Sequence, residues 1–213
     1  MCKTSRPPWW QFNPQQAFKA CISATILATV VMVGGGTPAA YAQGQGLAAV
    51  GPVDPANGFP QFYQDRPGQK LAPCLVTSAA DPCALAGTFP NPAAPIAFPA
   101  NFPGEFFYWN ATAVIRQGNF RATVTMALEG AFGGPTGAVV NGQQITFARF
   151  RFRTTGGTLT PGATYTLTYP FGVKTFVAAA DGTINFTDDQ GCTAIPPACN
   201  FGFVLPSTMS DRS

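Results

Sequence analysis

Residues 105–129 read EFFYWNATAVIRQGNFRATVTMALE, and this stretch decides the fold because its apolar residues recur at every second position. Odd positions from Phe107 to Ile115 are apolar. After the turn residues 117–119 the apolar positions become even, from Phe120 to Leu128. A period of two, broken once by a glycine-containing turn, is typical of a β-hairpin. We therefore expect two antiparallel strands here.

Segments 143–154, 164–169, 173–178 and 183–186 continue this pattern. In the first, the apolar phase switches near Phe147, which predicts a β-bulge. The last two flank Asp181-Gly182, a strong hairpin signal, and 200–205 is expected to form a final strand. No helix-period stretch after residue 42 exceeds two turns. The sequence predicts an all-β fold, an antiparallel β-sandwich or a jelly-roll-like domain, over about residues 104–205.

Proline and glycine dominate residues 43–103, which lack a sustained period. Such a segment cannot be helical and supplies few strand donors. Its many phenylalanine side chains indicate that it packs on something, because a true linker would be polar. We expect an extended segment that wraps across the sheet, with one edge strand near 70–76, and a flexible tail over 206–213.

The first 42 residues have the parts of a secretory signal peptide. Basic residues at positions 3, 6 and 19 come without acidic ones, an apolar run follows from 20 to 36, and Ala40-Tyr41-Ala42 is a small-x-small cleavage site. We expect cleavage after Ala42, so that the mature chain begins at Gln43 and is secreted or displayed on the cell surface.

Removal of this leader changes the charge of the protein. The full chain has 12 Lys and Arg against 9 Asp and Glu, a formal net charge of +3, and the three leader charges are all basic. The mature chain is therefore neutral overall, which speaks against nucleic acid or an anionic membrane as a partner. No later apolar run reaches the ~20 residues of a membrane-spanning helix.

Four cysteines remain in the mature chain. Cys74 and Cys83 flank one short loop and Cys192 and Cys199 flank another, so two local disulfides are the simplest of three possible pairings. The spacings do not match zinc motifs, and the chain has no histidine. We expect Cys74–Cys83 and Cys192–Cys199 bridges in an oxidising compartment.

The lack of histidine also excludes Ser-His-Asp and Cys-His catalysis. The chain has two glutamates, Glu105 and Glu129, near neighbouring strand ends of the predicted hairpin. A carboxylate pair of the kind that glycoside hydrolases use is therefore available. The competing interpretation places Glu129 on a solvated strand face near Arg121, with no catalytic role.

Two further groups are candidate ligand-binding residues. Arg149, Arg151 and Arg153 alternate along one strand, and such a row could grip acidic sugars or other carboxylates. Cross-strand pairing with acidic residues is the more common use of such arginines. Phe106 and Tyr108 could form an aromatic platform for sugar rings, unless a second layer covers them.

Calcium is the one cofactor for which the sequence offers candidate ligands. Asp181, Asp188 and Asp189 could supply the hard oxygen atoms that Ca²⁺ prefers. Their spacing does not match an EF-hand, and a tight Asp-Gly turn explains Asp181 equally well.

Several longer motifs carry a resemblance: GPVDPANGFPQFYQD at 51–65, FPANFPGEFFYW at 98–109, LEGAF at 128–132, QITFARFRFR at 144–153, and ATYTLTYPFGVKTF at 163–176 followed by INFTDDQG. In these the chain resembles a group of bacterial secreted or cell-surface β-domain proteins without an established activity. The resemblance implies location and domain type only.

Three functions remain open at this point. The leading interpretation is a non-catalytic secreted or cell-surface module that binds or structures a partner, with a glycan or a cell-envelope component as candidates. The alternative is a carboxylate-dependent glycan hydrolase that uses Glu105 and Glu129. The third is a passive structural module within a larger surface protein.

Overall fold

The computed structural model describes residues 21–24 (backbone only), 46–75, 91, 93–194 and 199–207. Within these ranges the fold is all-β, as predicted, with antiparallel sheets packed together and one short 3-10 helix. The elements are β1 (Cys21–Ala24), β2 (Leu47–Val50), β3 (Tyr63–Asp65), β4 (Lys70–Leu71), β5 (Glu105–Gln117), β6 (Phe120–Phe132), β7 (Gln144–Thr155), β8 (Thr164–Tyr169), β9 (Gly172–Val177), β10 (Asn185–Gly191) and η2 (Phe201–Val204).

The central layer is a four-stranded sheet in the order β10-β7-β6-β5. Its longest strands are the predicted hairpin, in which Gln117 pairs with Phe120 across a two-residue turn. Gly118 in that turn has a φ of 56°, a left-handed conformation that favours glycine. Strand β7 then pairs with β6 without interruption, from Arg121 opposite Thr155 to Phe132 opposite Gln144.

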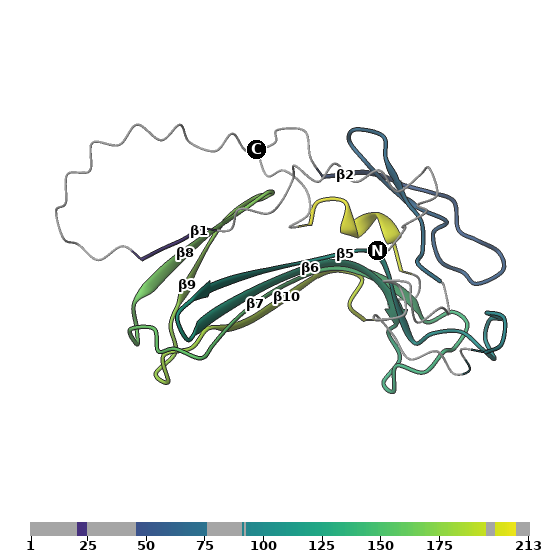
Figure 1. Ribbon diagram of the computed structural model, residues 1–213. Helices are drawn as coiled ribbons and strands as arrows, with labels where there is room; N and C mark the ends of the chain where they lie inside the picture. The colour runs from purple at the N-terminus through teal and green to yellow at the C-terminus, as the bar shows by residue number, and fades with distance from the viewer. Residues whose placement is uncertain (1–20, 25–45, 76–90, 92, 195–198, 208–213) are drawn as a thin grey trace, which may run out of the picture.

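Two small sheets, β1-β8-β9 and β2-β3-β4, complete the layers. Figure 1 shows the four-stranded sheet as an arch, with the β8–β9 hairpin at one end and β2 with η2 above the other. The core lies between them. Phe150 and Phe152 of β7 contact Phe176 of β9, and Phe106 of β5 contacts Phe59 and Phe102 of the proline-rich segment.

The bulge predicted near Phe147 is wrong. The register of β7 with β6 is continuous there, and the shift lies in β5, between Phe107 and Trp109. The apolar phase of β7 changes for another reason. At this end the outward face is also covered, since Phe147 and Ile145 pack with Cys192 in a second apolar cluster.

Two other predictions about elements need correction. A turn is present at Asp181-Gly182, but β9 pairs with β8 and β10 with β7, so the flanking strands enter different sheets. The expected strand at 200–205 is the 3-10 helix η2, whose first turn is capped by the Asn200 side chain accepting from the Gly202 N–H.

The predicted Cys192–Cys199 disulfide is confirmed, with 5.8 Å between the two Cα atoms. Cys74 is also disulfide-bonded, but Cys83 lies outside the described residues, so that pairing stays a prediction. The leader over 1–42 and the tail over 206–213 lie largely outside them too. Of the leader the structure describes β1, which pairs with β8. Among the described residues, no helix is long and apolar enough to cross a membrane.

Candidate functional site

The candidate site lies on the outward face of the four-stranded sheet, opposite the core. In β6 the core face takes Val124, Met126 and Leu128, so the alternate positions face outward. The register then brings the outward residues of the other strands beside them. Five arginines share this face: Arg116 on β5, Arg121 on β6, and Arg149, Arg151 and Arg153 on β7.

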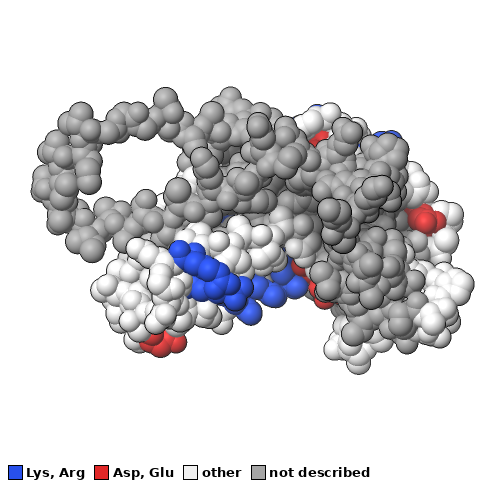
Figure 2. Space-filling model, viewed as in Figure 1, with Lys and Arg blue, Asp and Glu red and all other residues white. Residues whose placement is uncertain are grey.

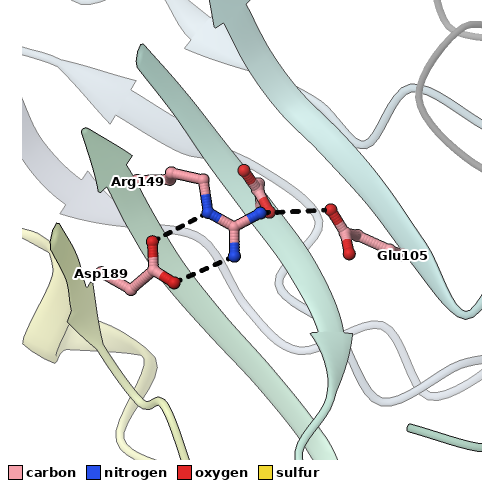
Figure 3. A network of polar contacts seen from close by, with 4 residues as sticks. Glu105, Arg149 and Asp189 are labelled. Carbon is pink, nitrogen blue, oxygen red and sulfur yellow. Dashed lines mark hydrogen bonds and ion pairs between the residues drawn. The ribbon is translucent and has the colours of Figure 1, made fainter. Parts of the chain in front are cut away.

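Arg149 stands at the centre of a carboxylate cluster, which we define as Arg149, Glu105, Glu129 and Asp189. Its Nε and Nη2 donate to the two carboxylate oxygens of Asp189, over 2.8 and 2.9 Å. Figure 3 shows this fork, with Glu105 on the other side of the guanidinium. The Nη1 atom lies 3.0 Å from Glu129 Oε2 and 3.7 Å from Glu105 Oε1. Arg149 thus forms the predicted cross-strand pair with an acidic residue.

Glu129 is the unusual member of this cluster, because its residue surface is only 1% exposed. Its Oε2 makes no hydrogen bond among the described residues, although it lies within ion-pair distance of Arg149. Burial, helped by a hydrogen bond with Glu105, raises the pKa of Glu129 to about 8 against the pull of Arg149. The raised pKa favours the protonated form of this carboxyl group near neutral pH.

This geometry disfavours catalysis by the glutamate pair. The prediction that Glu129 is solvated near Arg121 is wrong, since β6 places those residues at opposite ends. The two glutamates do come together, as the hydrolase interpretation requires. Glycoside hydrolases, however, hold their carboxyl groups about 5–10 Å apart with the sugar between them. Here the Arg149 guanidinium fills the position between the two carboxyl groups, and Glu129 is buried beside it.

The remaining arginines of the face form what we call the arginine stripe: Arg116, Arg121, Arg151 and Arg153. Among the described residues, no carboxylate lies within 4.0 Å of their guanidinium groups. Arg151 and Arg153 stand opposite Thr187 and Asn185 of β10, and Arg116 stands directly opposite Arg121. Figure 2 shows basic side chains gathered in one band beside a smaller acidic patch.

One atom of the stripe is buried without a partner. The Nε of Arg151 has no hydrogen bond among the described residues, although water barely reaches it. A buried N–H of a charged group that lacks an acceptor is costly, roughly 1–3 kcal/mol or more. An anion bound at Arg151 would supply the missing acceptor.

The predicted aromatic platform does not exist. Phe106 and Tyr108 are buried, at 1% and 6% exposure. The bulge in β5 turns both toward the proline-rich segment, where the Tyr108 hydroxyl donates to the Pro60 carbonyl oxygen and Phe106 packs edge-on against Phe59. A second layer therefore covers these two side chains.

The three candidate calcium ligands have other partners. Asp181 accepts from the N–H and the hydroxyl of Thr183, Asp188 pairs with Lys174 at 3.2 Å, and Asp189 binds Arg149. Within the described ranges, no group of three or more acidic, cysteine or histidine side chains is arranged to hold a metal. In the carboxylate cluster the position between the carboxyl groups is filled by the Arg149 guanidinium.

Sequence reasoning missed two members of the stripe, Arg116 and Arg121. The signal was present, because a two-residue turn at Gly118-Asn119 places these positions opposite each other. Comparison with protein-family models, with curated proteins and with solved structures finds no match to this chain. The resemblance to bacterial surface β-domains therefore stays a prediction.

Proposed function

We propose that this chain is an exported, non-catalytic binding module whose arginine stripe holds an anionic ligand. The observation that carries the proposal is the absence of any carboxylate partner for four guanidinium groups on one sheet face, among the described residues. Arginine is the side chain best suited to bind carboxylate, sulfate or phosphate groups through paired N–H donors.

The energetics of the stripe support a ligand. Like charges directly opposite each other in a sheet destabilise it by roughly 0.2–1 kcal/mol, and Arg116 faces Arg121 in this way. Folding alone gives no reason to keep this pair. An anion between the two guanidinium groups would turn the repulsion into charge-assisted hydrogen bonds, each contributing about 1.5–3 kcal/mol.

The carboxylate cluster sets one limit of the site. Its Asp189 neutralises Arg149, and the Glu105 side chain is 42% exposed beside it. An anionic ligand is repelled there. The ligand is therefore confined to the open part of the face, from Arg151 on β7 toward Arg116 on β5.

Retention on immobilised polysaccharide tests the proposal. We expect the mature protein to be retained at low ionic strength on carboxylated polygalacturonate and to pass through its methyl ester, which has the same backbone without the charge. The double variant Arg151→Thr/Arg153→Thr should lose retention, and Arg66→Thr, an exposed arginine outside the sheet face, should keep it.

Two results would overturn this function. One is equal retention of the double variant and the parent protein. The other is failure of the parent to bind any carboxylated, sulfated or phosphorylated matrix. An assay of reducing ends in the same eluates tests the hydrolase alternative. Release of sugar by the parent protein, lost in Glu129→Gln, would support a hydrolase.

A further inference from the structure

We propose, resting on the function above, that the ligand is a linear acidic polysaccharide that lies diagonally across β7, β6 and β5. The stripe runs across three neighbouring strands of the sheet. Arg151 and Arg153 are on β7, Arg121 is two residues further along on the neighbouring strand β6, and Arg116 is opposite it on β5.

The spacing of the stripe calls for a polymer. Alternate residues of a strand are about 6.6 Å apart, and neighbouring strands are about 4.8 Å apart. From Arg151 to Arg116 the register spans four residues along the sheet and two strand spacings across it. The backbone positions at the two ends are therefore about 16 Å apart. One carboxylate accepts N–H donors within about 3 Å, so a single small anion cannot engage the whole stripe.

The neighbours of the arginines suit sugar hydroxyl groups. Beside the arginines lie short hydroxyl and amide side chains, together with the exposed Val114. The Oγ1 atoms of Thr112 and Thr125 are 3.3 Å apart. These groups both donate and accept hydrogen bonds. On the outward face the set comprises Thr112, Thr123, Thr125, Thr155, Asn185 and Thr187.

Nucleic acid fits the same face less well. Proteins that bind single strands combine basic residues with aromatic rings on which bases stack. Over the open part of this face, the described residues include no aromatic side chain facing outward. Phe107 and Phe147 face outward only at the closed end, opposite Glu129.

Binding of labelled galacturonic acid oligomers of one, two, four and eight units to the mature protein tests this inference by fluorescence anisotropy. We expect affinity to rise at least about tenfold between the one-unit and four-unit probes, as more guanidinium groups are engaged. In Arg116→Thr/Arg121→Thr we expect the affinity for the short probes to be unchanged. The affinity for the long probes should fall to that of the short probes. Arg66→Thr is the matched control, and thermal melts establish that each variant is folded.

The outcomes separate this inference from the proposed function. Equal affinity for all lengths, or a length dependence that survives in Arg116→Thr/Arg121→Thr, would overturn the polymer and leave an anion site. Tighter binding of single-stranded DNA with the same number of charges would overturn the polysaccharide class. Failure of every probe would instead count against the proposed function itself.

Discussion

Glu129 is a buried acidic residue whose pKa is raised chiefly by its burial. Residues 126–130 of β6 are all buried, and the Glu129 carboxyl group lies 3.0 Å from the Arg149 guanidinium with 1% of the residue exposed. Burial raises the pKa of Glu129 and outweighs the attraction of Arg149, which donates Nε and Nη2 to Asp189 and turns only Nη1 toward Glu129. A protonated carboxyl group is the consequence.

This raised pKa makes stability depend on pH with a defined sign. The folded state holds the proton of Glu129 up to about pH 8, whereas the unfolded chain releases it near 4.5. The stabilisation is thus complete below pH 4.5 and is lost as pH rises toward 8, with a slope of up to about 1.4 kcal/mol per pH unit. We expect denaturant melts to show this fall for the parent protein and not for Glu129→Gln.

The control for that experiment is Asp181→Asn. The hydrogen bonds from Thr183 lower the pKa of Asp181, so its contribution has the opposite sign and is lost as pH falls. This variant should keep the slope between pH 4.5 and 8. A parent protein whose stability does not change across that window would refute the account of Glu129.

Arg121 gives a second prediction at the scale of single residues. Arg121→Thr removes the repulsion with Arg116 and places a good strand former on β6, so we expect the free energy of unfolding to rise by about 0.2–1 kcal/mol. Binding of the anionic ligand should weaken in the same variant. Arg149→Thr should instead lower the free energy of unfolding, because it leaves the carboxylate cluster without its cation. Destabilisation by Arg121→Thr in a thermal melt would give this arginine a structural role instead.

Among the elements, the turn at Asp181-Gly182 determines how the layers connect. The Gly182 N–H donates to the Ala179 carbonyl oxygen, and the Gly182 carbonyl accepts from the Leu159 N–H. The chain leaves β9 in one sheet and enters β10 in the other within this turn. Gly182 therefore needs both its φ of 72° and close contact with the backbone of the 158–159 segment.

Gly182→Val and Gly118→Val separate these two requirements. Both glycines have positive φ, which costs a branched residue roughly 1–2 kcal/mol. A Cβ at Gly182 would also lie 2.8 Å from the Leu159 carbonyl oxygen, while a Cβ at Gly118 meets nothing within 4 Å. We expect Gly182→Val to lower the thermal midpoint more than Gly118→Val. Equal midpoints would mean that the contact with Leu159 is misplaced.

The sequence predicts those elements that depend on residues close together in the chain. Alternation located β5 to β8 to within a few residues, and the short loop between Cys192 and Cys199 predicted their bridge. The partners of β9 and β10 were missed because pairing depends on contacts between distant segments, such as Asp189 with Arg149. The burial of Glu129 was missed for the same reason. The alternation of side chains along β7 predicted that Arg149, Arg151 and Arg153 share a face. It did not predict that, of these three, Arg149 alone pairs with an acidic residue among the described residues.

At the scale of the whole molecule, the four-stranded sheet has two different faces. One is the core, filled from above by β8–β9 and by the proline-rich segment. The other is closed at one end by the Cys192–Cys199 disulfide and the carboxylate cluster, and its arginine stripe lies toward the β5–β6 turn. Five of the described arginines therefore gather on one face of the sheet.

Export gives a prediction for the complete chain. The basic leader and the Ala40-Tyr41-Ala42 site predict that protein recovered from the medium or the periplasm begins at Gln43. Intact mass spectrometry measures this directly. Recovery of a species that retains residues 1–42 would contradict export with cleavage, and with it the neutral charge of the working protein.

The most direct measurement of the central claim is the NMR spectrum of the arginine Nε–Hε groups during titration of the mature protein with galacturonic acid oligomers. The account predicts that the signals of Arg116, Arg121, Arg151 and Arg153 shift together, with Arg151 gaining the acceptor it lacks. Arg149, held by Asp189, and Arg66, outside the sheet face, should not move. Shifts confined to Arg66 or Arg149, or no shift at a concentration where anisotropy reports binding, would contradict the assignment of the arginine stripe as the ligand site.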